Sequence, residues 1–405
     1  MKRRRKEIKN KLVVILILSF SLFSISPQRL SATSFLNKDM NKKIPIIIVP
    51  GLFGSVLYED KNDNNKMDEG EEISPNFPKL FWSIKDEHLK TLLLDQNGND
   101  LPGSKIRVGN ILGKLEISKV PILGLFLPDQ PLYDSLASLL ESLGYSVFPF
   151  TYDWRKDIRQ SAERLENLIE EKSKETPNGK VILIGHSLGG LISRYAVVRN
   201  EKVAKMVDKI IMIGTPNCGS PMSYFALKFG LKGRGINKKQ AQNVIQNFPS
   251  LYQSLPNQDF FNLYGPIFEK EEKNLTIEDT YLYNPNSALE NQSLVQIAKE
   301  FWQEIDAWDK PGKIPENIKT YLISGKDIPT SIKIIKRKRF LREKYYREYA
   351  DGDEEIPILS SERLIGPNII KLPRISKASH QGMPANKDVQ KVIAEILTKE
   401  KIEEK

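Results

Sequence analysis

Short apolar runs alternate with amphipathic stretches along most of this 405-residue chain. Such runs are typical of strands that are buried on both faces of a parallel sheet. They lie at Ile44–Val49, Tyr145–Phe150, Val181–Ile184, Lys209–Ile213 and Thr320–Ser324. Amphipathic helices are predicted between strands, at Leu132–Leu143 and Ile158–Lys172, where parallel connections require them. The pattern predicts an α/β protein with a mostly parallel sheet flanked by helices.

The alternation lapses after the strand at Lys209–Ile213. Between about 217 and 318, aromatic and aliphatic residues cluster without a clear strand–helix repeat. They include Met222, Tyr224, Phe225, Leu227, Phe229, Phe248, Leu251, Tyr252 and Leu255. We expect an inserted cap or lid in which most of them form a core, while some could line an acyl-chain groove and exclude water.

The clearest candidate for chemistry is Ser187, in the sequence Gly185-His186-Ser187-Leu188-Gly189. A serine between a buried strand and a helix, flanked by glycines, occupies the sharp turn on which hydrolases expose a nucleophile. Both the preceding strand and the following helical stretch are present in the sequence. We therefore predict that Ser187 is a catalytic nucleophile.

A serine nucleophile needs a base, and the base needs an acid that orients it. Of the three histidines, His88 precedes the serine and His186 adjoins it, which leaves His380 as the base under the chain order of such hydrolases. Two acids are credible from the pattern: Asp327, which follows a predicted strand, and Asp353, which lies in a turn-forming stretch. The pattern alone does not decide between them.

Read together, several motifs resemble the lecithin:cholesterol acyltransferase family, with its phospholipase and diacylglycerol-acyltransferase relatives. They occur in the family's order between residues 43 and 385. They are Ile46–Ser55, Tyr152-Asp153-Trp154-Arg155, the serine turn, Gly214–Ser220, Asp351-Gly352-Asp353 and the late histidine. The resemblance implies an α/β-hydrolase fold, an acid at Asp353 instead of Asp327, and a hairpin inserted at about 328–350.

The resemblance also implies an oxyanion hole, in which two backbone N–H groups stabilise the charge that develops on the carbonyl oxygen. One N–H group would belong to Leu188, directly after the nucleophile, and the other to Leu52, in the loop after the first strand. For the Tyr152–Arg155 motif we expect a structural role, because Asp153 and Arg155 can fix their loop by an internal ion pair.

Residues 1–32 differ from the rest of the chain. A basic start precedes an apolar stretch from Leu12 to Phe23 and a small residue at a candidate cleavage point, as in a secretory signal peptide. An uncleaved N-terminal anchor is the alternative, and residues 33–405 would form the hydrolase domain. The segment carries a net charge of +7, which leaves only +3 of the chain's +10 for the remainder. The charge therefore gives no support to a nucleic-acid partner.

A second basic run, Lys333–Arg347, contains interleaved aromatic residues. Such runs are usually solvated hairpin faces, and the functional alternative is attraction to anionic lipid headgroups near the active site. Cys218 is the only cysteine, so no intramolecular disulfide can form. This fits a bacterial exported protein, secreted or attached to the cell surface, that relies on core packing. We expect Cys218 to be a small buried residue and the protein to be a monomer.

Residues 60–71 have the spacing of oxygen-bearing side chains found in an EF-hand calcium loop. The candidate ligands are Asp60, Asn62, Asn64, Asp68 and Glu71. Position six of the loop is Asn65 instead of glycine, and an acidic surface turn is the simpler interpretation. Calcium here would be structural, and no cofactor is required for the predicted chemistry.

The predicted function is an exported serine-dependent lipid acyl hydrolase or O-acyltransferase that forms an acyl-enzyme on Ser187. Its substrate would be a lipid or phospholipid ester at a membrane or lipid surface. Water as acceptor would give a lipase or phospholipase, and an alcohol would give a transferase. The alternatives are a nonlipid esterase or peptidase of the same fold, and a noncatalytic exported binding protein on a hydrolase scaffold.

Overall fold

The computed structural model describes residues 43–68, 71–74, 90–115, 130–230, 238–265, 267–270, 291–306, 314–339 and 342–403. All of them belong to one compact unit, Lys42–Lys405. The predicted signal or anchor segment, residues 1–32, lies outside the described residues and stays a prediction. None of the described helices combines the length and the apolar character that crossing a membrane requires.

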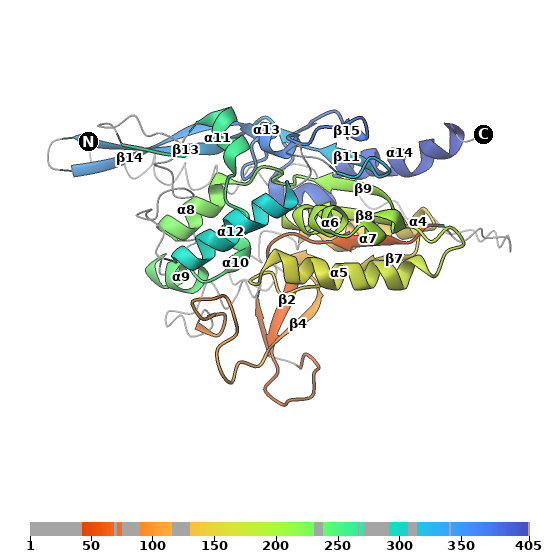
Figure 1. Ribbon diagram of the computed structural model, residues 1–405, viewed down its shortest axis with the longest axis horizontal. Helices are drawn as coiled ribbons and strands as arrows, with labels where there is room; N and C mark the ends of the chain where they lie inside the picture. Colours follow the sequence, from red (N-terminus) through yellow and green to blue (C-terminus); the bar gives the residue numbers. More distant parts are fainter. Residues whose placement is uncertain are drawn as a thin grey trace, which may run out of the picture. The chain divides into compact units, whose positions relative to one another are not determined.

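A six-stranded parallel sheet forms the centre of this unit (Figure 1). Its strand order is β15-β11-β9-β8-β1-β7, and every neighbouring pair is parallel. The strands are β1 (Ile46–Val49), β7 (Val147–Pro149), β8 (Val181–His186), β9 (Val207–Ile213), β11 (Lys319–Ile323) and β15 (Ile369–Lys371). The predicted parallel sheet is confirmed, and β15 is a strand that the sequence pattern did not indicate.

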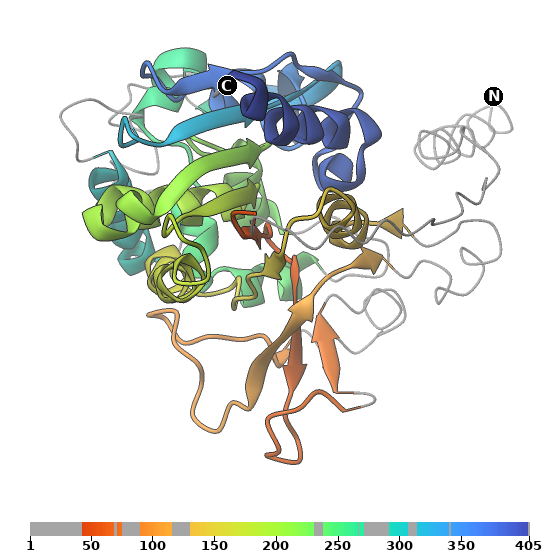
Figure 2. The same ribbon diagram turned by 90° about the vertical axis from the view of Figure 1, so that its right-hand side faces the viewer.

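Helices cover both faces of this sheet, because alternate residues of its strands point to opposite sides. Ile47 and Val49 pack in the core beneath α5 (Ile158–Ser173) and α6 (Leu188–Arg199). Ile46 and Ile48 pack on the other side, against the helices α4 (Tyr133–Ser142) and α14 (Lys387–Glu403). Figure 2 shows the two helical layers on either side of the strands. Burial on both faces explains why the strands read as continuous apolar runs.

The helix α5 shows how the sequence sets these elements. Its N-cap Asp157 accepts a hydrogen bond from the backbone N–H of Arg159, which satisfies one free donor of the first turn. Its buried residues recur three or four positions apart, so that one stripe faces the sheet. They include Ile158, Ala162, Leu165 and Ile169. The predicted helices at Leu132–Leu143 and Ile158–Lys172 are both confirmed within two residues at each end.

A mostly helical segment lies between β9 and β11, where the predicted alternation lapses. Its elements are α8 (Pro221–Phe229), α9 (Lys238–Ile245), α10 (Pro249–Gln253), α11 (Gln258–Tyr264), β10 (Phe268–Lys270) and α12 (Gln292–Ile305). Phe248 and Leu255 are fully buried here, as expected for the core of a cap. The ring of Phe301 in α12 stacks on Tyr195 of α6 at 5.6 Å between centroids, which anchors this cap to the core around the central sheet.

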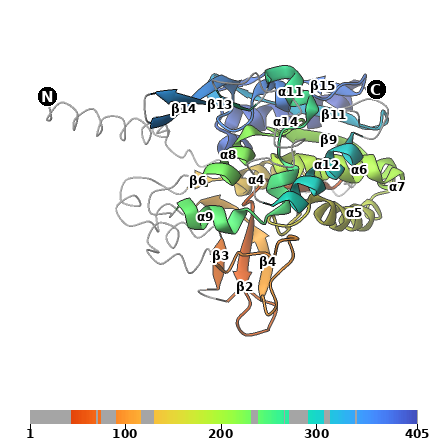
Figure 3. The ribbon, with the colours of Figure 1, turned by 60° about the vertical axis from the view of Figure 1, so that its left-hand side comes forward.

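Two of the further sheets have three described strands each. β2 (Ser55–Glu59) pairs with β3 (Glu72–Ser74) and β4 (Ile106–Ile111), and β13 (Ile328–Arg339) pairs with β10 in parallel and with β14 (Arg342–Gly352) as a long antiparallel hairpin. In Figures 1 and 3 they lie toward opposite edges of the central sheet. The smaller elements are β5 (Lys114–Leu115), β6 (Gln130–Pro131), α7 (Glu201–Met206), β12 (Gly325–Lys326), α13 (Ile358–Ser361), β16 (Ile375–Ser376) and the 3-10 helix η3 (His380–Ala385).

Candidate active site

Ser187 lies on a sharp turn between β8 and α6. Its backbone angles, φ 52° and ψ −122°, are rare for a residue with a side chain and are typical of strained functional turns. The Ser187 N–H donates to the carbonyl of Ile213 at 2.9 Å, which holds the turn against β9. At Gly189 a Cβ atom would overlap the carbonyl of Val49, so the helix can start here only with glycine. The predicted turn is therefore present, and packing enforces it.

His380 lies between Ser187 and Asp353. Its Nε2 is 2.8 Å from the Oγ of Ser187, and its Nδ1 is 2.8 Å from Oδ2 of Asp353. The other oxygen of Asp353 accepts hydrogen bonds from the N–H groups of Glu355 and Ile356, at 3.1 and 2.7 Å. The side chains of His380 and Asp353 are each 1% exposed. The three predicted residues thus meet in one continuous hydrogen-bonded chain.

Asp327, the alternative acid, lies elsewhere. Its carboxylate accepts a hydrogen bond from the Ser376 hydroxyl at 2.7 Å and is 3.7 Å from the Lys326 ammonium group. Its backbone N–H donates to Asp351 at 2.6 Å, within the same turn region as Asp353. The structure therefore brings Asp353, and not Asp327, to the imidazole of His380.

The charges around His380 favour its protonated form. Burial alone would lower the pKa of His380, but the nearby carboxylates of Asp353 and Glu355 outweigh burial and raise that pKa to about 9. The Glu355 carboxylate, which helps to raise this pKa, is partly exposed to solvent. Its Oε2 lies 3.8 Å from His380 Nε2, and its side chain is 36% exposed. A hydrogen bond of 3.1 Å from Gln381 Nε2 holds the Glu355 carboxylate there.

The two predicted oxyanion donors lie beside the serine. A Cβ atom on Gly51 would stand 2.9 Å from the Cβ of Ser187, so the loop that carries Leu52 lies directly against the predicted nucleophile. Leu52 and Leu188 both line the same cavity as Ser187. Neither of their N–H groups donates a hydrogen bond to any residue that the structure describes. Neither group therefore has a competing acceptor in the described part of the chain.

The Tyr152–Arg155 motif supports this loop. The Tyr152 hydroxyl donates to the carbonyl of Pro50 at 2.8 Å, and Trp154 Nε1 donates to the carbonyl of Ser55 at 3.0 Å. Arg155 is fully buried and pairs with Asp153 at 2.6 Å, so the predicted ion pair is confirmed. The motif therefore holds both ends of the loop that carries the Leu52 N–H.

Two residues of the site were missed by the sequence analysis. Tyr133, at the start of α4, accepts a hydrogen bond from the Gly51 N–H at 2.9 Å, and its hydroxyl is 2.7 Å from Nδ1 of His186. His186 Nε2 in turn lies 3.0 Å from the carbonyl oxygen of His380. The position of His186 next to the serine was a usable signal, whereas nothing in the sequence marked Tyr133.

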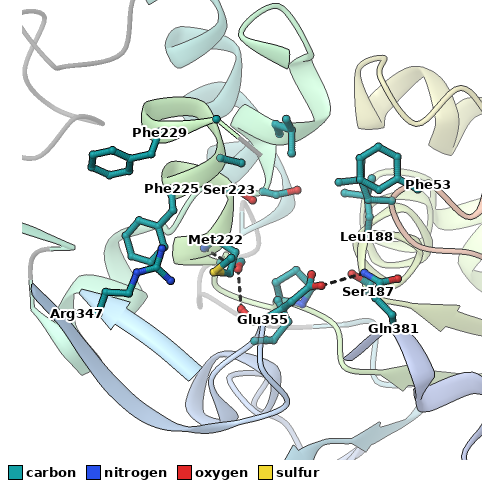
Figure 4. Close-up of a pocket in the computed structure, with 18 residues that line it drawn as sticks. Phe53, Ser187, Leu188, Met222, Ser223, Phe225, Phe229, Arg347, Glu355 and Gln381 are labelled. Carbon is teal, nitrogen blue, oxygen red and sulfur yellow. Dashed lines mark hydrogen bonds between the residues drawn. The ribbon is translucent and has the colours of Figure 1, made fainter. Parts of the chain in front are cut away.

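Ser187 opens into a cavity of about 340 Å³ (Figure 4). Its walls come from the loop after β1, the start of α6, the cap, β14 with the segment after it, and the start of η3. The larger apolar lining residues include Leu52, Phe53, Leu188, Met222, Phe225, Phe229, Leu251 and Ile356. Met222, Phe225, Phe229 and Leu251 belong to the predicted cap cluster, so part of that cluster faces the cavity while the rest forms the cap core.

The described residues of the predicted calcium loop, 60–68 and 71, are joined by hydrogen bonds within the loop. Asp60 accepts from the N–H groups of Asn64 and Asn65 at 3.0 Å, and Glu71 accepts from the Asp68 N–H at 2.9 Å. The amide of Asn62 donates to Asp68 at 3.1 Å. Among the described residues, no group of three or more His, Cys, Asp and Glu side chains is arranged to hold a metal ion. Calcium binding would require the Asn amides to turn away from Asp68, and it stays a prediction.

Cys218 is fully buried, as predicted. Burial raises the pKa of its thiol to about 12. A thiol in this state is inert as a nucleophile at neutral pH. The cysteine therefore has a packing role beside the cap.

A family model and one solved structure agree with this architecture. The family model described as lecithin:cholesterol acyltransferase matches residues 81–310. A chain in the crystal structure of the Tle4–Tli4 complex superimposes with a TM-score of 0.54 at 14% identity, covering 87% of this chain and 98% of that one. The mature lipase BlEst2 of Bacillus licheniformis gives a TM-score of 0.42 at 15% identity, covering 90% of this chain and 96% of that one.

The comparison with curated proteins found no match. The likeness to the Tle4–Tli4 chain supports the α/β-hydrolase fold, with its parallel sheet and helices on both faces. The family model spans more than half of the chain and includes the serine turn and most of the cap. The protein therefore belongs to the lecithin:cholesterol acyltransferase family, and at the level of that family it is a lipid acyl hydrolase or acyltransferase.

Proposed function

We propose that the protein cleaves lipid esters through a covalent acyl-enzyme on Ser187. The observation that carries this proposal is the chain of two 2.8 Å contacts from Ser187 through His380 to Asp353. This chain ends in an apolar cavity, where a lipid acyl group would be desolvated. A noncatalytic binding protein would have no need for a strained serine in hydrogen-bonding contact with a buried histidine.

In the acylation step, Ser187 Oγ attacks the ester carbonyl while neutral His380 takes the hydroxyl proton at Nε2. Asp353 holds Nδ1–H and stabilises the imidazolium that forms. The N–H groups of Leu52 and Leu188 would donate to the oxyanion, and losing one such donor typically costs about 10²- to 10³-fold in rate. Collapse of the intermediate breaks the ester C–O bond, and His380 gives its proton to the leaving alkoxide.

In the second step, an acceptor O–H replaces the released alcohol. His380 Nε2 takes the acceptor's proton, the acceptor oxygen attacks the acyl carbonyl, and the proton returns to Ser187 as the acyl bond to Oγ breaks. Water gives a free fatty acid, whereas an alcohol gives a new ester. The cap residues Met222, Phe225 and Phe229 restrict water by covering the cavity with apolar surface.

The proposal includes export and action at a lipid surface. Export rests on the N-terminal pattern of residues 1–32. Surface contact is supported by three exposed tyrosines on the hairpin, Tyr345, Tyr346 and Tyr349, because tyrosine favours membrane interfaces. The ring of Tyr345 contacts Phe229 of the cavity wall at 5.5 Å between centroids, so the face of the hairpin that carries Tyr345 adjoins the cavity.

A fluorophosphonate probe tests the nucleophile directly. We expect the full chain to be labelled and the Ser187→Ala variant to be unlabelled. Ser223→Ala is the matched control, because Ser223 lines the same cavity and should not be the labelled residue. Absence of labelling in the wild type, or equal labelling after Ser187→Ala, would contradict the proposal.

Product analysis separates the acceptors and the alternatives. Mass spectrometry of the products from mixed phospholipids, with and without an added alcohol, should show released fatty acid, a new ester or both. Turnover of short p-nitrophenyl esters without any lipid turnover would favour a nonlipid esterase. Cell fractionation with N-terminal sequencing of the recovered protein tests export, and a protein retained in the cytoplasm would contradict that part.

A further inference from the structure

One cationic side chain lies in the wall of the otherwise mostly apolar cavity. Arg347, in the middle of β14, is the only lysine or arginine among the described residues that line it. Its guanidinium carbon lies 5.3 Å from the centroid of the Phe225 ring. Figure 4 shows Arg347 beside Phe225, reaching in from the hairpin strand. The hairpin thus brings a positive charge to the compartment that contains Ser187.

The guanidinium of Arg347 forms no hydrogen bond or ion pair with any residue that the structure describes. Other arginines of the protein do pair with carboxylates: Arg155 contacts Asp153 at 2.6 Å, and Arg374 contacts Glu362 at 2.8 Å. Arg347 is only partly exposed. A half-buried charge against apolar side chains is costly unless an anion pairs with it, and the ring of Phe225 offsets only part of that cost.

Among the described residues that line the cavity, the only acidic one is Glu355, which lies near the proposed catalytic histidine. Glu355 contacts His380 and Gln381, as described above, and no ion pair joins it to Arg347. Figure 4 shows Glu355 between Arg347 and Ser187. A bound anion would be repelled from the Glu355 side and attracted to the Arg347 side. The two opposite charges therefore make the cavity electrically asymmetric.

We propose that Arg347 binds the phosphate of a phospholipid substrate while the ester carbonyl lies at Ser187. The proposal rests on the lipid-ester chemistry argued above and adds a residue that selects for the headgroup. A guanidinium offers N–H donors in a planar fork that matches phosphate oxygens. The Phe225 ring lies 5.3 Å from the guanidinium carbon, and no residue that the structure describes accepts a hydrogen bond from the guanidinium N–H groups, so these groups stay available to the ligand.

The test uses two soluble substrates that differ only in the phosphate: dihexanoyl phosphatidic acid and dihexanoylglycerol, both kept monomeric so that surface binding plays no part. We expect Arg347→Gln to lower the ratio of kcat/KM for phospholipid over diacylglycerol by about 10- to 100-fold, the range for hydrogen bonds to charged groups. Arg347→Lys should recover part of the ratio. Arg337→Gln is the matched control, because Arg337 stacks on Tyr346 of the same hairpin but does not line the cavity.

An unchanged ratio in Arg347→Gln, or an equal fall in Arg337→Gln, would overturn the proposal. Inhibition by hexanoate distinguishes a second source of negative charge: if Arg347→Gln weakens only this inhibition, the arginine binds the product carboxylate and the phosphate assignment is wrong. Calorimetry of both lipids with Ser187→Ala and with Ser187→Ala/Arg347→Gln measures binding without turnover. The calorimetry tests the role of Arg347 even if the wild type hydrolyses neither lipid. Absence of hydrolysis would contradict the proposed enzymatic function and not the proposed binding by Arg347.

Discussion

His186 donates a hydrogen bond from its imidazole Nε2 to the main-chain carbonyl of His380, at 3.0 Å. A carbonyl can only accept, so the other ring nitrogen of neutral His186 accepts from the hydroxyl of Tyr133, at 2.7 Å. Burial, and then the proximity of His380, lower the pKa of His186 to about 3, which keeps the ring neutral as this arrangement requires. Tyr133 also accepts from the Gly51 N–H, so one network connects the base to the proposed oxyanion loop.

Replacing His186 should therefore impair both stability and turnover. We expect His186→Phe to lower the free energy of unfolding by about 1–3 kcal/mol, because the Tyr133 hydroxyl and the His380 carbonyl lose buried partners. We also expect a lower kcat as the backbone of His380 loses a support. Urea unfolding and steady-state kinetics measure the two effects. His186→Gln retains a donor and should lose less, and a His186→Phe protein with unchanged stability and kcat would refute the role.

The choice of acid can be tested by a matched pair of variants. We expect Asp353→Asn to lower kcat by about 10⁴-fold, because an amide in that place no longer favours the productive tautomer and charge of His380. Asp327→Asn should leave kcat within about twofold, because Asp327 contacts Ser376 and not the imidazole. Steady-state hydrolysis of a soluble ester measures both. The reverse order of effects would make Asp327 the acid.

Glu355 should set the pH dependence of the enzyme. His380 must be neutral to accept the serine proton, and its pKa of about 9 predicts that kcat/KM rises with pH up to that region. The ionisable groups that face His380 are Asp353, Glu354, Glu355 and His186. Removing the negative charge by Glu355→Gln lowers the pKa of His380, so the acid limb of the profile should move to lower pH.

A pH profile of kcat/KM on a neutral soluble ester measures this shift. The control is a carboxylate on the exposed part of the hairpin, Glu348, whose change to Gln should leave the limb in place. A limb that stays at the same pH in Glu355→Gln would show that this carboxylate does not act on the base.

The calcium prediction has a direct test. If the loop binds calcium, titration calorimetry of the full chain shows binding in the wild type and at least about 10-fold weaker binding in Asp68→Asn, since affinity follows the number of charged ligands. Asp68 is exposed and contacts only loop residues among those described, so its change should not disturb the hydrolase core. Absence of heat in the wild type would leave the loop as an acidic turn.

Much of the fold follows from the sequence because buried parallel strands leave a strong signal. The runs around Ile46 and Ile182 are apolar at every position, and both predicted strands are found. The short strand β15 was missed since Ile369–Lys371 has only three residues and lies at the sheet edge. The pattern from Gly185 to Gly189 predicted a sharp turn, and this turn is present. A Cβ atom at Gly185 or Gly189 would overlap neighbouring backbone atoms, so the turn needs these glycines.

The residues of the site differ in how far the sequence marks them. Ser187 and His380 follow from a motif and a chain-order rule, whereas the choice of Asp353 needed a resemblance, since a carboxylate in a loop has no pattern of its own. Tyr133 and Arg347 reach the site through a helix start and a hairpin strand that are distant in the sequence. Such contacts depend on how elements pack, which neither periodicity nor spacing records.

The strand β14 carries Arg347 and ends one residue before Asp353. Side chains alternate between the two faces of a strand, so deleting a single residue between these positions would turn one of them away from its partners. Directed-evolution libraries built on this hairpin should therefore keep its length fixed between the two residues. Diversity at position 347 alone would leave the register intact and would be the simplest route to an enzyme with a changed lipid preference.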